Sequence, residues 1–137
     1  MISDWRPVAE EVVRPRIFVV DDELVIASTL ATILQRSGFD AAWFTQPREA
    51  LKAARVKAPD LLITDVVMPE LSGIELAILM KEEFPNCRVL LFSGQAATAN
   101  LLHEARENGH NFELLSKPIH PTDLLKRIKK ATEQPVS

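Results

Sequence analysis

Two kinds of segment alternate along this chain of 137 residues, and the alternation limits the folds that it can adopt. Short apolar runs lie at residues 17–20, 41–44, 61–64, 89–92 and 112–115. They are too short to span a membrane and too apolar for half-exposed hairpins, which favours buried strands. Between them, apolar residues recur at helical spacing. About five strand–helix units follow, and they predict an α/β fold in three layers: a parallel sheet with helices on both faces.

Glycine and proline mark the ends of the helical segments. The apolar stripes of these segments are Ala27, Leu30, Ala31 and Leu34; Pro47, Ala50, Leu51 and Ala54; Ile74, Ala77 and Ile78; Ala97, Leu101, Leu102 and Ala105; and Pro121, Leu124, Leu125 and Ile128. Gly38 and Gly109 follow the first and fourth stripes, where a helix commonly ends. Pro47 and Pro121 suit the first turn of a helix. We expect one domain at residues 16–133, an arm at 1–15 that contains Trp5, and a tail at 134–137.

Composition narrows the choice of partners. The formal net charge is −3, and the only basic cluster spans residues 126–130, which we interpret as the solvated face of a C-terminal helix. Direct nucleic-acid binding needs clustered cations and is therefore not expected. The single cysteine, Cys87, excludes an internal disulfide. No apolar segment approaches about 18 residues and no signal peptide is evident, so we expect a cytoplasmic location without membrane contact.

Polar residues gather where the predicted strands end. Asp21 and Asp22 follow the first strand, Asp65 the third, Ser93 the fourth and Lys117 the fifth. The carboxyl ends of parallel strands share one edge, where open α/β sheets bind ligands. Each residue alone has a simple structural explanation, such as helix capping or a solvated loop. Their joint occurrence at the ends of four strands predicts a functional site.

Charge repulsion at this edge indicates a cation. Two like charges about 4 Å apart repel by roughly 4 kcal/mol at an effective dielectric constant of about 20. Three carboxylates with no histidine or cysteine among them suit Mg²⁺, which prefers oxygen ligands. Lys117 supplies a second positive charge. A carboxylate nucleophile beside Mg²⁺ and an ammonium group is an arrangement for phosphoryl transfer.

The same residues resemble the receiver domains of two-component response regulators. The resemblance covers roughly residues 16–133 and rests on Ile17-Phe18-Val19-Val20-Asp21-Asp22-Glu23, Asp65-Val66-Val67-Met68-Pro69 with Gly73, Ser93, and Lys117-Pro118. It implies a flavodoxin-like fold whose five parallel strands lie in the order 2-1-3-4-5.

The resemblance also implies a role for each site residue. Asp65 would accept a phosphoryl group from a phosphohistidine on a sensor histidine kinase or a histidine phosphotransfer protein. Mg²⁺ would be held by Asp22, Asp65 and the backbone carbonyl of Val67, with Asp21 acting through water. Ser93 would donate a hydrogen bond to a phosphoryl oxygen and Lys117 would form an ion pair with it. The chain would not be an ordinary enzyme, since it would only catalyse its own phosphorylation and lose the group slowly.

One position departs from the family pattern. Receivers commonly carry an aromatic residue three positions before the lysine, where this chain has Leu114. Phe112 precedes it by two residues and would share its strand face. We therefore hypothesise that the signal passes through displacement of residues 94–99 more than through a side-chain rotation at Leu114. A downstream protein would recognise the phosphorylated state by binding the face formed by the fourth helix, fifth strand and fifth helix.

Two alternatives come from other classes of protein. The chain could be a degenerate receiver that serves only as an interaction scaffold, but its complete set of site residues argues against this. It could instead be a small phosphohydrolase with an aspartyl nucleophile, similar to the haloacid dehalogenases. Those enzymes place a second acid two residues after the nucleophile, where this chain has Val67. We expect His103, His110 and His120 to have surface or loop roles.

Overall fold

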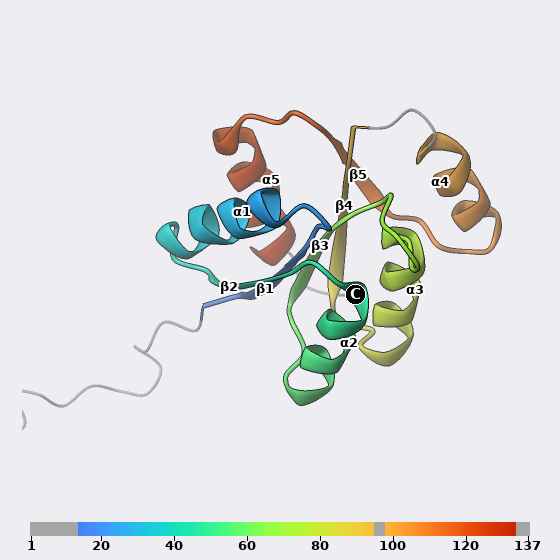
Figure 1. The fold of residues 1–137 in the computed structure, drawn as a ribbon, viewed down its shortest axis with the longest axis horizontal. Coiled ribbons are helices and arrows are strands. Elements are labelled where there is room, and N and C mark those ends of the chain that lie inside the picture. Colours follow the sequence, from blue (N-terminus) through green and yellow to red (C-terminus); the bar gives the residue numbers. More distant parts are fainter. Residues whose placement is uncertain (1–13, 95–97, 134–137) are drawn as a thin grey trace, which may run out of the picture.

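A parallel sheet lies between two layers of helices in the computed structural model of this protein (Figure 1). The structure describes residues 14–94 and 98–133. The predicted tail and nearly all of the predicted arm, including Trp5, lie outside the described residues. The predicted limits of the domain, residues 16 and 133, stay a prediction.

Strands and helices alternate without exception in the described part of the chain. In order they are β1 (Arg16–Val20), α1 (Leu24–Arg36), β2 (Asp40–Phe44), α2 (Pro47–Val56), β3 (Leu61–Asp65), α3 (Gly73–Glu83), β4 (Arg88–Ser93), α4 (Thr98–Glu107), β5 (Glu113–Ser116) and α5 (Pro121–Glu133). Among the described residues, no helix is long and apolar enough to cross a membrane.

The strand order is β2-β1-β3-β4-β5, and every neighbouring pair is parallel. The predicted order 2-1-3-4-5 is therefore confirmed. The register brings the ends of the central strands level. Val20 pairs with Thr64, Asp65 with Phe92, and Ser93 with Ser116. Residues that end or directly follow these strands consequently meet at one edge of the sheet.

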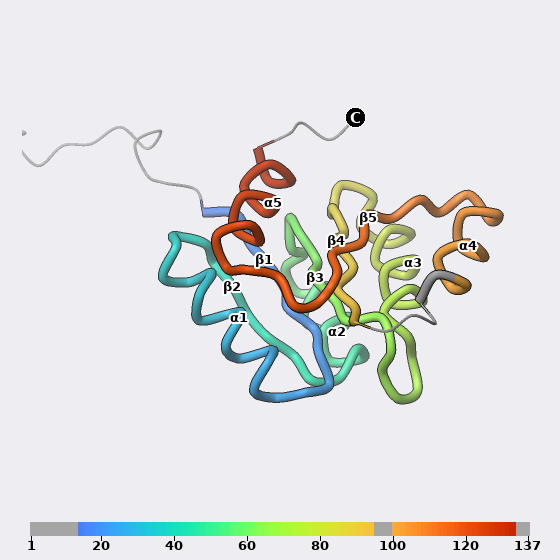
Figure 2. The backbone as a smooth tube through the Cα atoms, turned by 90° about the horizontal axis from the view of Figure 1, so that it is seen from above, coloured from blue at the N-terminus to red at the C-terminus, as the bar shows by residue number. Residues whose placement is uncertain are grey.

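The sheet separates two hydrophobic cores. One core joins its first face to α2, α3 and α4 through residues such as Leu51, Met80 and Leu102. The other joins the second face to α1 and α5 through residues such as Leu34 and Ile128. Figure 2 shows α1 and α5 on one side of the strands and α2, α3 and α4 on the other. Strands buried on both faces account for the nearly continuous apolar runs in the sequence.

The helix boundaries follow local chemistry. Gly38 and Gly109 have φ angles of 95° and 87°, the left-handed conformation that glycine adopts easily after a helix. Pro47 occupies the first turn of α2. The Ser72 side chain accepts a hydrogen bond from the backbone of Glu75, whose side chain in turn accepts one from the backbone of Ser72, so α3 begins with a capping box.

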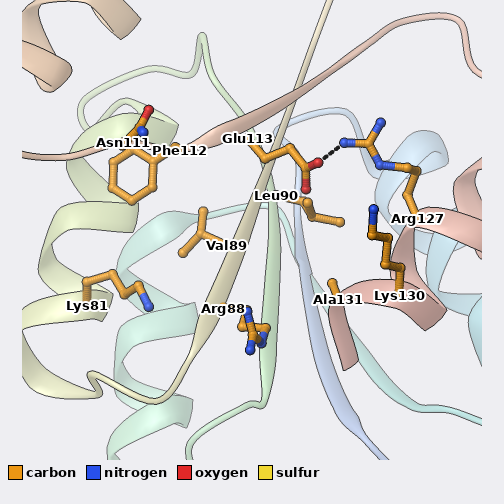
Figure 3. A pocket seen from close by; sticks show the side chains of 10 residues that line it. All are labelled: Lys81, Arg88, Val89, Leu90, Asn111, Phe112, Glu113, Arg127, Lys130 and Ala131. Atoms are coloured by element: carbon orange, nitrogen blue, oxygen red, sulfur yellow. Dashed lines mark hydrogen bonds and ion pairs between the residues drawn. The ribbon is translucent and has the colours of Figure 1, made fainter. Parts of the chain in front are cut away.

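The basic segment of α5 differs in part from its interpretation as a solvated face. Lys126 and Lys129 are exposed, as expected. Ile128 is fully buried, as its place on the predicted inward stripe requires, whereas Arg127 forms an ion pair with Glu113 of β5. Lys130 lines a cavity beside the sheet (Figure 3). Because successive residues of a helix point in different directions, the residues of this basic segment face different neighbours.

We expect Ile128→Ala to lower the free energy of unfolding by about 2–5 kcal/mol, because it removes buried methyl and methylene groups and leaves a cavity. Chemical denaturation checks this value. Val56→Ala is the matched control, since Val56 is 89% exposed and its truncation should change stability by less than about 0.5 kcal/mol. Equal losses in both variants would contradict the position of Ile128 in the core.

Candidate functional site

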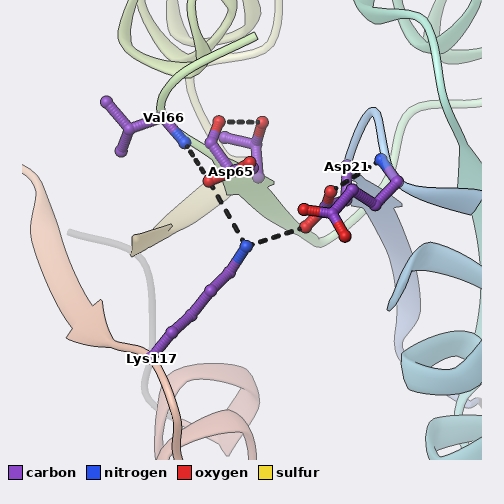
Figure 4. A network of polar contacts seen from close by, with 6 residues as sticks. Asp21, Asp65, Val66 and Lys117 are labelled. Carbon is purple, nitrogen blue, oxygen red and sulfur yellow. Dashed lines mark hydrogen bonds and ion pairs between the residues drawn. The ribbon is translucent and has the colours of Figure 1, made fainter. Parts of the chain in front are cut away.

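The predicted polar residues meet at the carboxyl edge of the sheet. Asp21 directly follows β1, Asp65 ends β3, Ser93 ends β4, and Lys117 directly follows β5. The side chain of Lys117 extends from the end of β5 toward the two aspartates on neighbouring strands (Figure 4). Four segments that are far apart in the sequence therefore supply one site.

Lys117 links two of the carboxylates. Its Nζ lies 3.0 Å from Asp21 Oδ2 and 3.5 Å from Asp65 Oδ1 (Figure 4). Burial alone would lower the pKa of Lys117, but its hydrogen bond to Asp21 and the negative charges of Asp21 and Asp65 outweigh burial and raise this pKa. The side chain is therefore held as an ammonium group.

Asp21 is a buried carboxylate whose two oxygens both have donors. The residue is 2% exposed, and its Oδ1 accepts a hydrogen bond of 2.9 Å from the Glu23 backbone N–H while Oδ2 faces Lys117. These donors offset the cost of removing the charge from water. Asp22, by contrast, is exposed. One oxygen from each of Asp21, Asp22 and Asp65 lies within 4.8 Å of the others.

Asp65 is held at both its side chain and its backbone. Its Oδ1 accepts a hydrogen bond of 2.9 Å from the Val66 backbone N–H, and its carbonyl oxygen accepts one of 2.9 Å from Thr64 Oγ1. Burial raises the pKa of the Asp65 carboxyl, and the charge of Asp21 raises it further. Lys117 and the Val66 N–H offset these effects only in part. The carboxylate of Asp65 therefore favours additional positive charge nearby.

Close backbone packing at Gly73 explains why the sequence motif has a glycine at this position. A Cβ atom at this residue would lie 1.8 Å from the carbonyl oxygen of Asp65, so no larger residue fits without displacement of the backbone. The Gly73 N–H donates a hydrogen bond of 2.8 Å to the carbonyl of Val66. The start of α3 thus packs directly on the backbone that carries Asp65.

Ser93 lies on the strand next to Asp65. Asp65 pairs with Phe92, so Ser93 lies one residue farther toward the site edge, and it is 4% exposed. Its carbonyl accepts a hydrogen bond of 3.0 Å from the Lys117 backbone N–H. Val67, two residues after Asp65, is 40% exposed, and the role of its carbonyl stays a prediction.

The donor set fits a hard divalent cation. Three carboxylates converge, and Lys117 forms ion pairs with two of them, Asp21 and Asp65. Oxygen ligands alone, one of them on the exposed Asp22, match the preference of Mg²⁺ for carboxylates together with water.

Two features of the site had no counterpart in the sequence interpretation. Thr64 falls within an apolar run, and its hydrogen bond to the next residue's carbonyl depends on its rotamer. An apolar groove also borders Lys117, lined on one side by Val25 and Ile26 of α1 and on the other by Pro118 and Ile119. Val25 is 74% exposed and lies off the inward stripe of its helix, which is the one signal that could have indicated the groove.

Met68 and the three histidines make contacts that are structural. Met68 is 8% exposed and belongs to the core. His103 pairs with Glu107 on the exposed side of α4, and His110 stacks on Phe112. In the loop before α5, His120 Nδ1 accepts a hydrogen bond from the Thr122 backbone N–H. The surface and loop roles expected for the histidines agree with these contacts.

Leu114 of β5 and Phe112, which directly precedes β5, contact the same core, as their predicted common face requires. Phe112 is buried in the core beneath α3 and α4, and Leu114 packs against the same core. The predicted route of the signal runs through residues 94–99, of which 95–97 lie outside the described residues. The proposed displacement of that segment stays a prediction.

The fold and this acidic edge define a class of phosphorylation-dependent signalling domains, and sequence comparison gives the family. Residues 17–129 match the family described as "Response regulator receiver domain". The chain belongs to this family. Receiver domains of this family function in two-component phosphorelay signalling, interact with histidine kinases and are generally not ordinary enzymes.

Individual relatives agree with the family assignment. The chain is 32% identical to the response regulator receiver protein CpdR of Brucella abortus over 84% of this chain and 94% of that protein. A CheY-like receiver domain protein from Methanospirillum hungatei superposes with a TM-score of 0.79 at 25% identity, covering 88% of this chain and 95% of the other. A beryllofluoride-activated receiver domain, DrrB, superposes with a TM-score of 0.76 at 27% identity, covering 89% and 100%.

Other curated relatives are longer proteins. The chain spans 47% of the transcriptional regulatory protein PhoP of Bacillus subtilis and 51% of the DNA-binding response regulator MtrA of Mycobacterium tuberculosis. The similarity to those proteins therefore concerns their receiver part.

We expect Asp65→Asn to raise the melting temperature in EDTA at pH 7–8 by about 2–5 °C. The pKa of Asp65 in the folded protein lies above its unfolded value, so ionisation of Asp65 costs stability as the pH rises through the folded pKa. Asparagine resembles the neutral carboxyl and avoids this cost, and the difference should shrink as the pH falls below the folded pKa of Asp65, where the wild-type carboxyl takes up its proton.

Thermal melts between pH 4 and 8 measure the effect. Asp123→Asn, in the exposed first turn of α5, is the control and should give no rise. A melting temperature of Asp65→Asn below wild type at neutral pH, or a difference independent of pH, would contradict the electrostatic account.

Proposed function

We propose that this receiver domain accepts a phosphoryl group on Asp65 from a phosphohistidine of a sensor histidine kinase or a histidine phosphotransfer protein. One observation carries the assignment: Lys117 bridges Asp65 and the buried Asp21, with oxygens of all three aspartates within 4.8 Å of one another. Asp65 ends its strand at the open edge of the sheet, where a large phosphodonor can approach.

The transfer exchanges one bond to phosphorus for another. A carboxylate oxygen of Asp65 forms a bond to phosphorus, the bond between phosphorus and the imidazole nitrogen breaks, and that nitrogen keeps the electron pair. Lys117 offsets negative charge on the transferred group, which adds about −1.5 to −2 charges to the site. Ser93, on the adjoining strand end, donates a hydrogen bond to a phosphoryl oxygen.

Mg²⁺ completes the charge balance in this proposal. Asp22, Asp65 and the backbone carbonyl of Val67 hold the ion, and Asp21 acts through water. When bound, Mg²⁺ offsets charge on the oxygens of the transferred phosphoryl group. The exposed position of Asp22 and the buried, lysine-paired position of Asp21 support this division between direct and indirect ligands.

The two alternative functions are less well supported. A scaffold without phosphorylation leaves the convergence of three carboxylates and one lysine unexplained. A phosphohydrolase needs a second acid two residues after the nucleophile, and Val67 is there. We infer that the chain only phosphorylates itself and slowly loses the group, and that a downstream protein reads the face of α4, β5 and α5. The cytoplasmic location stays a prediction.

Asp65→Asn should abolish phosphorylation while the fold is kept, because the nucleophilic oxygen is lost and the shape is not. Intact-protein mass spectrometry after incubation with acetyl phosphate and Mg²⁺ should show one labile adduct on the wild type and on the control Asp123→Asn. Full stoichiometry on Asp65→Asn would refute the assignment. Continuous release of phosphate without a stoichiometric adduct would indicate the phosphohydrolase, and no reaction of the wild type would indicate the scaffold.

Mg²⁺ should stabilise the wild type by mass action, by about 1.4 kcal/mol at ten times its dissociation constant. Asp22→Ala should remove most of this gain and Asp21→Ala somewhat less. Thermal melts of each protein with and without Mg²⁺ provide the test, since any change of stability unrelated to the metal cancels in the difference. Asp123→Ala serves as control. An unchanged Mg²⁺ dependence in either site variant would show that our ligand assignment is wrong.

A further inference from the structure

Thr64 is a polar residue in an apolar setting. It is fully buried, and the residues two positions before and after it, Leu62 and Val66, both belong to the hydrophobic core that faces α2, α3 and α4. A buried hydroxyl group costs free energy unless it forms a hydrogen bond. Valine has nearly the same shape as threonine and carries no hydroxyl group. Packing of the core alone therefore does not require a threonine at this position.

The Thr64 hydroxyl contacts the backbone of the candidate phosphoacceptor. Its Oγ1 donates a hydrogen bond of 2.9 Å to the carbonyl oxygen of Asp65. The same carbonyl oxygen packs on the backbone of Gly73, where a Cβ atom would lie only 1.8 Å away. The direction of the Asp65 carbonyl is therefore fixed by a hydrogen bond from Thr64 and by a close backbone contact with the start of α3.

The peptide group between Asp65 and Val66 carries this constraint to the Asp65 side chain. A peptide group is planar, so the direction of its C=O sets the direction of its N–H. The Val66 N–H donates a hydrogen bond of 2.9 Å to Asp65 Oδ1 (Figure 4). Lys117 Nζ lies 3.5 Å from the same oxygen. Rotation of the peptide group would move the Val66 donor away from Oδ1 and allow the carboxylate to adopt other rotamers.

We propose that Thr64 is a positioning residue for the phosphoacceptor. Its hydroxyl orients the Asp65–Val66 peptide group, and this peptide group orients the carboxylate of Asp65. The inference rests on the proposed function, because the orientation of the carboxylate affects a rate only if Asp65 attacks phosphorus. Phosphoryl transfer needs the attacking and leaving atoms roughly in line with phosphorus, and a misplacement of about 1 Å can slow a reaction by about 100-fold.

The variants Thr64→Val and Thr64→Ser separate the hydroxyl group from the rest of the side chain. Valine keeps the shape and removes the donor, whereas serine keeps the donor and loses a methyl group. We expect phosphorylation of Asp65 by acetyl phosphate and Mg²⁺ to slow at least about fivefold in Thr64→Val and less than about twofold in Thr64→Ser. Time courses of intact-protein mass spectrometry give these rates.

Thr32→Val is the matched control. The Thr32 hydroxyl also donates to a backbone carbonyl, that of Ser28 at 2.8 Å, but it lies on the exposed side of α1. Its removal should leave the rate of phosphorylation unchanged.

Hydrogen exchange of the Val66 amide, followed by NMR, tests the route through the peptide group. We expect this amide to exchange at least about fivefold faster in Thr64→Val, while Thr64→Ser keeps the wild-type rate. Amides in the buried part of α5 should exchange at the wild-type rate in both variants, because the fold is retained. Slower phosphorylation of Thr64→Val with unchanged exchange at Val66 would overturn the inference.

The remaining outcomes distinguish this inference from the proposed function. An unchanged rate in Thr64→Val, or equal slowing in the valine and serine variants, would overturn the role of Thr64 and leave Asp65 as the acceptor. A wild type that takes up no phosphoryl group would overturn the proposed function and this inference with it. If Thr64→Val loses its fold, Thr64→Ala against Thr64→Ser makes the same comparison, since alanine and serine differ only by the hydroxyl group.

Discussion

The candidate site depends on the contact between Lys117 and Asp21. Two aspartates follow β1 and a third ends β3, so parallel pairing of these strands brings like charges together. Lys117, delivered by β5, lies 3.0 Å from Asp21 and 3.5 Å from Asp65. In the strand order, β5 is separated from β3 only by β4, so the long side chain of Lys117 can reach the aspartates at the ends of β1 and β3. The order of the strands thus supplies the positive charge that the carboxylates need. Fold and site therefore constrain each other.

The layout of strands and helices was readable from the sequence because each element is consistent with its surroundings. Residues 61–63 are apolar at every position, since both faces of their strand are covered by helices. Gly38, Pro47 and Gly109 mark boundaries through backbone geometry that other residues adopt less easily. Strand ends then located Asp65 and Lys117 at a common edge without any knowledge of side-chain positions.

Features that depend on neighbours distant in sequence could not be read in the same way. Helical spacing placed Ile128 on the inward stripe, but the ion pair between Arg127 and Glu113 of β5 depends on the direction in which α5 crosses the sheet. The cavity beside Lys130 exists because α3, β4, β5 and α5 meet there. The bond from Thr64 to the Asp65 carbonyl depends on one side-chain rotamer. Such features become visible only once the elements are packed.

The contact of Gly73 with the Asp65 carbonyl has a mechanical consequence. A Cβ atom at Gly73 would lie 1.8 Å from that oxygen, so the backbone of α3 packs directly on the end of β3 with no side chain between them. The Gly73–Val66 hydrogen bond and the capping box tie the two elements further. Backbone packing, a hydrogen bond and a helix cap thus join Asp65 to the start of α3. Under the proposed function, a structural response to phosphorylation of Asp65 would therefore be taken up at the ends of β4 and β5 more than between β3 and α3.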